Sequence, residues 1–299
     1  MTSTRSGNLL AAFSFLLWGL TPLYYQLLPN SSTDDLLAIR IIVSVPFTAV
    51  LVYVLRNQWP KLVEIFSDRK SLMFATLASV VYCVSWYTFT WAMTNNHVMD
   101  ASLAFFISPL MMVTLGFFIF RERMSIGKWC ALLFALIGVM YQVVQYGQVP
   151  TIALTMALAF TIYGWCKKNI AYSWDVSLFV EALVLAPVAL FYLLSHPSEL
   201  VAANLTSNFA TLALYLGSGP ITLLPLIFYS MAVRRTDMSN IGLMQYIEPS
   251  LQFFLAITVF GEAFDRVKMV GFSFIWLGLV FIAFETLMTK YVRHKRLSH

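Results

Sequence analysis

Residues 101–109 read Ala-Ser-Leu-Ala-Phe-Phe-Ile-Ser-Pro, and residues 241–249 read Ile-Gly-Leu-Met-Gln-Tyr-Ile-Glu-Pro. Both stretches lie in long apolar runs, and in both a polar residue stands directly before the proline. A glutamate follows each proline after 13 residues, as Glu122 and as Glu262. Because the same landmarks recur 140 residues apart, we infer that the chain contains an internal repeat.

Positions outside these two stretches also correspond, 140 to 145 residues apart. The matched positions are Trp18-Gly19 with Tyr163-Gly164, Arg40 and Pro46 with Glu181 and Pro187, and Ala92 with Ala232. We therefore divide the chain into a first repeat over 1–147, a second repeat over 148–290, and a basic tail over 291–299. The plainer alternative is that these residues are packing signals shared by many helical bundles.

The composition indicates a membrane protein. Of 299 residues, 60% are hydrophobic and 11% are charged, and the mean hydropathy is +0.76. A soluble domain carries about 25% charged residues, so lipid must solvate part of this apolar surface. A spanning helix needs roughly 20 mainly apolar residues. The sequence contains ten such runs, at 8–28, 36–55, 72–93, 98–119, 128–146, 150–168, 177–194, 209–231, 238–260 and 268–290.

Continuous apolar runs exclude a transmembrane barrel, whose strands alternate in hydrophobicity. We therefore expect an all-α membrane protein with ten transmembrane helices, five in each repeat. Sixteen of the 19 Lys and Arg residues lie on one side of these helices, Arg266 and Lys268 lie on the other, and Arg40 lies within a helix. Since basic residues collect on the cytoplasmic side, we expect both termini in the cytoplasm of a multi-pass cell (inner) membrane protein. The net charge of +5 is explained by this pattern, so no nucleic-acid partner is expected.

Five helices in each repeat place the second repeat upside down relative to the first. Inverted repeats around a site at the membrane midplane are a recurrent transporter architecture, because one repeat rocking against the other gives alternating access. We expect a secondary transporter of a small-molecule substrate within the lipid bilayer, driven by a proton gradient or by the solute's own gradient. The alternatives are an intramembrane enzyme and a receptor or scaffold that has this fold but does not transport.

No cofactor or metal is expected, and no catalytic residue is identified. The chain contains neither a Gly-x-x-x-x-Gly-Lys-[Ser/Thr] loop nor a His-Glu-x-x-His motif, and its three cysteines lack metal-ligand spacing. The spacing of Gly271 and Gly278 permits close contact between helices, which a homodimer or packing within one chain explains equally well.

The sequence resembles the EamA-type proteins of the drug/metabolite transporter superfamily, and among them the RarD group. The resemblance is specific in residues 96–110, 116, 121–123, 245–250 and 261–262. It covers nearly the whole chain and implies an exporter of metabolites or drugs in the inner membrane, without an ATPase domain. Two positions depart from the pattern of the group, because Asn is expected where Ser108 stands and a small residue where Glu248 stands. A mechanism placed on Glu248 is therefore specific to this protein.

Ionisable residues within a span cost roughly 2.5–3.5 kcal/mol at its centre, so each invites a functional hypothesis. Glu248 lies about 15 Å into its run, near the membrane midplane. It could bind and release a proton or hold a substrate ammonium group, or it could be a neutral carboxyl hydrogen-bonded for structure. Arg40 suits a carboxylate or phosphate. Its alternatives are extension to the membrane surface and pairing with Asp34 or Asp35.

Glu181 is the repeat counterpart of Arg40 and a second candidate for proton coupling; pairing with Lys167 or Lys168 is the alternative. Pro109 and Pro249 should kink their helices and free a carbonyl, which membranes tolerate beside protein or a cavity. We expect both helices to line the substrate pathway. The other expected pathway residues are Ser108, Gln245, Tyr246 and Gln252, with Trp18, Trp86, Tyr87 and Tyr163 as aromatic surface for an amphipathic cargo. The alternative for these aromatic residues is packing or a membrane-interface belt.

Overall fold

The computed structural model describes residues 2–28, 33–94, 98–147, 151–196, 209–261 and 266–297. All regular secondary structure within these ranges is helical, which confirms the predicted all-α class. The helices are α1 (Thr2–Tyr25), α2 (Thr33–Arg56), α3 (Leu62–Ser67), α4 (Arg69–Thr94), α5 (Val98–Phe118), α6 (Ile126–Tyr146), α7 (Thr151–Asn169), α8 (Trp174–Ser195), α10 (Phe209–Val233), α11 (Met238–Gln245), α12 (Ile247–Thr258) and α13 (Arg266–Leu297).

The apolar runs of the sequence coincide with these helices to within several residues at their ends. In the described ranges, seven helices are long and apolar enough to cross a membrane, and Leu103–Phe118 is a shorter apolar helix. The count of ten spans stays a prediction. The short helix α3 was not predicted, and α13 continues through most of the expected tail, to Leu297. Glu262, one of the repeat landmarks, lies outside the described residues.

The run 238–260 is interrupted, and Pro249 explains where. A proline has no N–H to donate to the carbonyl four residues earlier, and its ring crowds that carbonyl. For Pro249 this carbonyl belongs to Gln245, which is the last residue of α11. Pro109 differs, because α5 continues as one helix on both sides of it. At Pro249 the helix is thus interrupted, whereas at Pro109 it is continuous; the kink expected at Pro109 stays a prediction.

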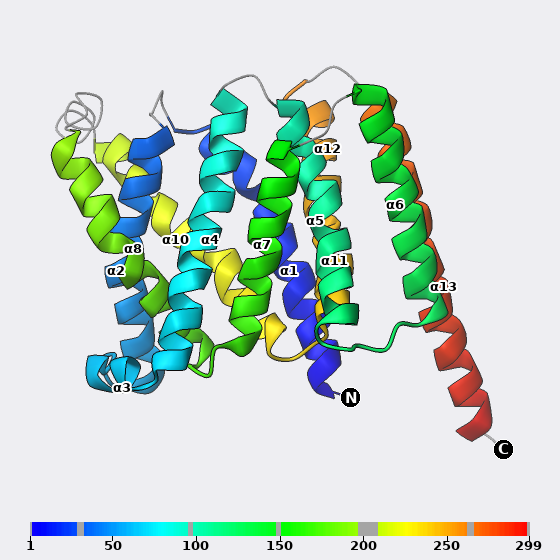
Figure 1. Ribbon diagram of the computed structural model, residues 1–299, viewed down its shortest axis with the longest axis horizontal. Coiled ribbons are helices and arrows are strands. Elements are labelled where there is room, and N and C mark those ends of the chain that lie inside the picture. Colours follow the sequence, from blue (N-terminus) through cyan, green and yellow to red (C-terminus); the bar gives the residue numbers. More distant parts are fainter. Residues whose placement is uncertain are drawn as a thin grey trace.

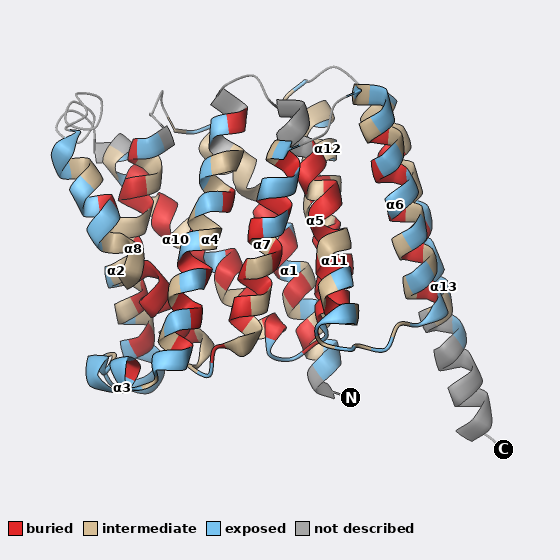
Figure 2. Ribbon diagram, in the orientation of Figure 1, coloured by how far each residue is buried: buried red, intermediate tan, exposed pale blue. Residues whose placement is uncertain are grey.

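Successive long helices run antiparallel, so α1 begins and α13 ends at the same end of the bundle (Figure 1). We call this the terminal end, and the other the opposite end. Buried residues concentrate where the long helices face one another (Figure 2). α1 packs against α10, α11 and α12; α7 packs against α4 and α5; α2 packs against α8, and α6 against α13. Each of these contacts joins a helix of the first predicted repeat to a helix of the second.

Small residues bring α6 and α13 together. A Cβ atom at Gly138 would lie 2.9 Å from the carbonyl oxygen of Gly271, and one at Gly278 would lie 2.9 Å from the Cα of Ala131. Glycine is therefore required at both positions for this close approach. The Gly271–Gly278 spacing is thus used for packing within the chain, while a homodimer stays a prediction.

α5 and α12 end in the same way. Arg121 and Gly261, which are 140 residues apart, both have a positive φ, of 52° and 64°. The amides just before them, of Phe120 and Phe260, both donate to a carbonyl five residues earlier. The left-handed conformation suits glycine and strains arginine. Equivalent positions of the two predicted repeats therefore make the same turn.

Candidate functional site

Arg40 is buried near the opposite end of the bundle. It lies seven residues into α2, about 10 Å from the start of the helix, and only 6% of it is exposed. Its guanidinium carbon lies 4.4 Å from the centre of the Trp86 ring on α4, and Nη1 donates a long, 3.5 Å hydrogen bond to the Tyr25 hydroxyl on α1. Three helices thus bring a cation and aromatic rings together. The predicted alternatives, extension to the surface and pairing with Asp34 or Asp35, are not seen among the contacts of Arg40 with the described residues.

Tyr82 and Glu248 complete this group, which we call the Arg40 cluster: Tyr25, Arg40, Tyr82, Trp86 and Glu248. The Tyr82 hydroxyl lies within electrostatic range of Arg40, Tyr25 and Glu248. It is buried beside Trp86 and makes no hydrogen bond of ordinary geometry in the described residues. Tyr25, Trp86 and Glu248 remain partly accessible. The cluster is therefore less completely buried than Arg40 alone.

Glu248 lies one turn before Gln252 on α12, and the Gln252 amide donates to its Oε1 at 3.4 Å. A Cβ atom at Gly19 would lie 3.3 Å from the Glu248 carbonyl oxygen, so α1 approaches α12 closely at this residue. The two repeat landmarks Trp18-Gly19 and Glu248-Pro249 are thereby adjacent in space. Both predicted pathway residues Glu248 and Gln252 lie together.

Tyr87 does not join its neighbour Trp86. It is 49% exposed and belongs to an outward stripe of α4 that recurs every three to four residues. The exposed members of this stripe are Met73, Leu77, Val80, Val84, Tyr87 and Trp91. Such a stripe is the lipid-facing side of a membrane helix. Tyr87 therefore lies on the outer face of α4. This position agrees with the alternative role, packing or a membrane-interface belt, that the sequence analysis gave for the aromatic residues.

The predicted polar residues around the two prolines connect α5 to α11. The Gln245 amide donates to the Ser108 hydroxyl at 2.8 Å, and the Tyr246 hydroxyl donates to the Phe106 carbonyl at 3.3 Å. Gln245 Oε1 has no hydrogen-bond partner in the described residues. Ser108, Gln245 and Tyr246 are all buried, as are Pro109 and Pro249. In this conformation they hold two helices together.

Glu181 and Lys167 form a buried ion pair in the half of the bundle nearer the terminal end. Lys167 Nζ lies 2.6 Å from Glu181 Oε1, and Lys167 is 3% and Glu181 8% exposed. Ser177 donates to the same carboxylate oxygen at 2.6 Å, and the Tyr163 hydroxyl lies 3.3 Å from the other. The predicted alternative for Glu181, pairing with Lys167, is what the structure shows. We call Tyr163, Lys167, Ser177 and Glu181 the Lys167 cluster.

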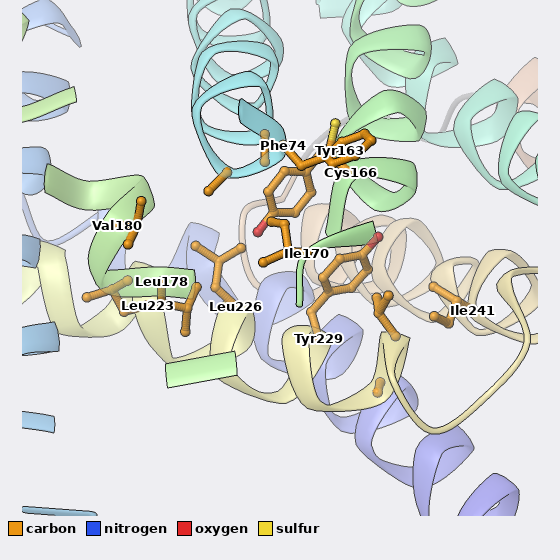
Figure 3. Packing of buried hydrophobic residues seen from close by; sticks show 14 of the residues in the cluster. Phe74, Tyr163, Cys166, Ile170, Leu178, Val180, Leu223, Leu226, Tyr229 and Ile241 are labelled. Carbon is orange, nitrogen blue, oxygen red and sulfur yellow. The ribbon is translucent and has the colours of Figure 1, made fainter. Parts of the chain in front are cut away.

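Aromatic rings connect the two clusters. Trp18 packs against Tyr229 with ring centres 5.7 Å apart, and Tyr229 stacks on Tyr163 at 5.7 Å, as Figure 3 shows for these two side chains. Tyr163 in turn lies 5.0 Å from Tyr82, and Tyr82 6.4 Å from Trp86. Tyr163 and Tyr229 are fully buried and Trp18 nearly so. The bundle therefore has a dense aromatic centre toward the terminal end.

Glu122 fastens the terminal end. Its two carboxylate oxygens accept hydrogen bonds from the backbone amides of Met238 at 2.6 Å and Ser239 at 2.8 Å, in the first turn of α11. Lys168 Nζ lies 3.5 Å from the same carboxylate. A Cβ atom at Gly116 would lie 2.5 Å from Glu122 Oε2, so the glycine makes room for it. A carboxylate at a helix N-terminus is stabilised by free N–H groups and by the helix dipole.

Sequence reasoning did not identify Tyr25, Tyr82 and Tyr229 as site residues, nor the capping role of Glu122. Tyr25 could have been found from its spacing of seven residues after Trp18, which puts both on one helix face. Tyr82 could have been found in a similar way, because it lies four residues, or one helical turn, before Trp86. The role of Glu122 depends on a contact between residues more than 100 positions apart, and no local pattern predicts it.

The chain is similar to known proteins in sequence and in fold. The model of the EamA-like transporter family matches residues 5–144. Protein RarD of Salmonella typhi is 36% identical over 96% of this chain and 97% of its own length. Protein RarD of Escherichia coli K12 is 33% identical, with the same two coverages. An uncharacterized transporter, YojE of Bacillus subtilis, is 32% identical over 96% of both chains. A protein of known crystal structure, 16% identical, has the same fold, with a TM-score of 0.69 over 92% of this chain and 97% of its own.

Proposed function

This chain belongs to the EamA-like transporter family, in the RarD group of the drug/metabolite transporter superfamily, and on that premise we propose that it exports a small amphipathic molecule by alternating access. It is a multi-pass membrane transporter. The cargo, the outward direction and the coupling to protons are parts of the proposal.

One observation carries the proposal, namely the contrast between the two halves of the bundle. Toward the terminal end, Tyr163, Lys167 and Tyr229 are sealed from solvent. Toward the opposite end, Trp86 and Glu248 remain partly accessible. Tighter burial toward one end than toward the other is expected of one state of an alternating-access cycle.

The helix packing supports the two inverted repeats that such a cycle needs. The contact of α1 with α10 corresponds to that of α7 with α4, and the contact of α1 with α11–α12 corresponds to that of α7 with α5. The shared location of both chain ends (Figure 1) and the basic residues that precede and follow the helices there support a cytoplasmic terminal end. Movement of one repeat against the other would then open the terminal end as it closes the opposite one.

Uptake and release by proteoliposomes tests the proposal against its rivals. A panel of neutral, cationic and anionic amphipathic solutes is loaded inside vesicles of known protein orientation, with and without an imposed pH gradient. A transporter releases at least one solute faster than protein-free vesicles do. An intramembrane enzyme would instead alter the solute or lipid chemically, and a receptor or scaffold would leave every release rate unchanged.

We expect Trp86→Ala to slow release of the transported solute at least tenfold, because Trp86 lies in the Arg40 cluster and its ring stacks over the guanidinium carbon at 4.4 Å, a contact worth about 1–2 kcal/mol where water is excluded. Tyr87→Ala is the matched control, since Tyr87 follows Trp86 directly on α4 but faces outward. Its release rate should stay within about twofold of the unmodified protein. Equal losses in both variants would show that α4 matters only for folding.

Glu248→Gln should abolish the response of transport to an imposed pH gradient while leaving transport down the solute gradient in place. Glutamine has nearly the same volume as glutamate and can still hydrogen-bond to Gln252, but it cannot bind a proton. The control is Glu64→Gln, which changes an exposed carboxylate paired with Lys61 on α3. A pH response that survives in Glu248→Gln would mean that Glu248 is structural and that protons are coupled elsewhere or not at all.

A further inference from the structure

We propose that the Arg40 cluster binds the carboxylate group of the cargo, so that the transported molecule is an organic monoanion with a flat apolar body. This rests on the proposed transport function and narrows it to one class of substrate. Three features of the cluster support it: the charge of Arg40, the arrangement of its donors, and the fit of the surrounding rings.

Among the described residues no carboxylate forms a salt bridge with Arg40, although the residue is buried and Glu248 belongs to the same cluster. The Lys167 cluster is a useful contrast, because its cation faces Glu181 at 2.6 Å and is further hydrogen-bonded to Ser177. A charge removed from water is costly unless it is paired. The equivalent helix of the first predicted repeat therefore keeps a positive charge that an incoming anion can neutralise.

The donors of Arg40 are free to make a two-point contact. Arginine carries five N–H donors in one plane, and the described protein residues accept from it only through the 3.5 Å bond to Tyr25. The guanidinium carbon lies over the Trp86 ring, 4.4 Å from its centre, and this contact uses none of the N–H donors in a hydrogen bond to an oxygen. A guanidinium with unused donors can bind a planar oxyanion through two parallel hydrogen bonds.

The surroundings favour a carboxylate over a doubly charged phosphate and provide a place for an apolar body. Glu248 lies in the same cluster, so the cluster carries one net positive charge when Glu248 is protonated and none when it is ionised. A monoanion neutralises the larger of these charges, and a dianion exceeds it. The buried Tyr82 hydroxyl, close to Trp86 and within electrostatic range of Arg40, donates no hydrogen bond of ordinary geometry to the described residues. The rings of Tyr82 and Trp86, with centres 6.4 Å apart, provide the surface on which a flat apolar group would lie.

Equilibrium binding of four probes with one shared ring system tests the inference. The probes are 2-naphthoate, 2-naphthamide, 2-naphthylmethylamine and 2-naphthyl phosphate, measured on the purified full chain in micelles, with empty micelles subtracted. We expect 2-naphthoate to bind about tenfold or more tightly than the uncharged amide, as a hydrogen bond between charged groups implies. The amine and the phosphate should bind more weakly than the carboxylate.

Variants of Arg40 assign the preference to this residue. Arg40→Gln should remove the preference for carboxylate over amide, and Arg40→Lys should retain only part of it, because lysine keeps the charge and loses the planar fork. Tyr82→Phe, which removes only the hydroxyl, should weaken 2-naphthoate binding a few-fold and leave the amide unaffected. Arg69→Gln, at an exposed arginine of α4, is the control and should change none of the affinities.

Unchanged binding of the amide shows that Arg40→Gln is folded; if that variant fails to fold, Arg40→Lys and Tyr82→Phe decide the question. A carboxylate preference that persists without the guanidinium, or equal losses for all probes, would overturn the inference. Vesicles that transport a solute while the protein shows no carboxylate preference would refute the anion site and leave the transport function standing. A carboxylate preference without any transport would refute the transport function instead.

Discussion

Lys167→Met is expected to lower the free energy of unfolding by about 3–5 kcal/mol, as removal of one partner from a buried ion pair typically does. Lys167 and Glu181 lie 2.6 Å apart, and both are nearly inaccessible. The substitution leaves the Glu181 carboxylate buried with only the hydroxyls of Ser177 and Tyr163 beside it. Reversible unfolding in mixed detergent micelles, followed by tryptophan fluorescence, measures the loss.

Two further variants separate the loss of pairing from the loss of a side chain. The double variant Lys167→Met, Glu181→Leu removes both charges and should recover most of the stability, because a well-packed apolar pair is often neutral relative to a buried ion pair. Lys61→Met breaks the exposed pair with Glu64, 3.0 Å apart, and should cost no more than about 1 kcal/mol. A loss below about 1 kcal/mol in Lys167→Met itself would show that the buried pair is not a stabilising element of this conformation.

Glu122→Ala is expected to open the terminal end. The Glu122 carboxylate holds the first turn of α11 through two backbone amides, and Asp237, the residue before α11, does not cap the helix with its side chain. Loss of hydrogen bonds to a charged group, worth roughly 1.5–3 kcal/mol, shifts an equilibrium about tenfold to a hundredfold. In the proposed cycle, the conformation whose population increases is the one with an open terminal end.

Two native thiols report on the two ends of the bundle. Cys166 is fully buried toward the terminal end, whereas Cys83 is half-buried and within electrostatic range of Arg40. In chains that keep only one cysteine, Glu122→Ala should raise the rate of maleimide labelling at Cys166 about tenfold or more and lower it at Cys83.

Glu64→Ala, which removes an exposed carboxylate, serves as the control and should change neither labelling rate. Faster labelling at both cysteines of Glu122→Ala would indicate local unfolding. An unchanged rate at Cys166 would show that Glu122 does not hold the terminal end closed.

Hydropathy predicted where the helices lie along the chain, but it could not predict how each one is rotated about its axis. Trp86 and Tyr87 are neighbours of similar character, and the sequence placed both on the pathway. The structure directs Trp86 toward Arg40 and Tyr87 outward. Successive residues on a helix point about 100° apart, so one of two neighbours generally faces away from any given partner. Packing against other helices determines which of the two neighbours faces the partner, and this packing cannot be predicted from the local sequence.

For a related reason, the sequence could not show whether Arg40 and Glu181 are paired with opposite charges. Glu181 and Arg40 occupy matching places in the two predicted repeats, and for both the sequence offered a nearby opposite charge as an alternative to a role in transport. Among the residues that the structure describes, only Glu181 forms a salt bridge of this kind, because the end of α7 brings Lys167 against α8. The difference between the repeats lies in contacts between helices. It is this difference that makes Arg40 the better candidate for binding and Glu181 the better candidate for stability.

The matched turns after α5 and α12 bear on how the chain is inserted into the bilayer during synthesis. Both turns use the left-handed conformation, which glycine adopts freely at position 261 and arginine adopts at position 121 at a cost of about 1–2 kcal/mol. Under the proposed orientation, Arg121 lies on the cytoplasmic side, where basic residues direct topology, and Gly261 on the other side, where they would oppose it. If that orientation holds, the same turn geometry lies on both faces of the membrane, and the arginine in one turn favours correct insertion at a cost to the stability of the folded state.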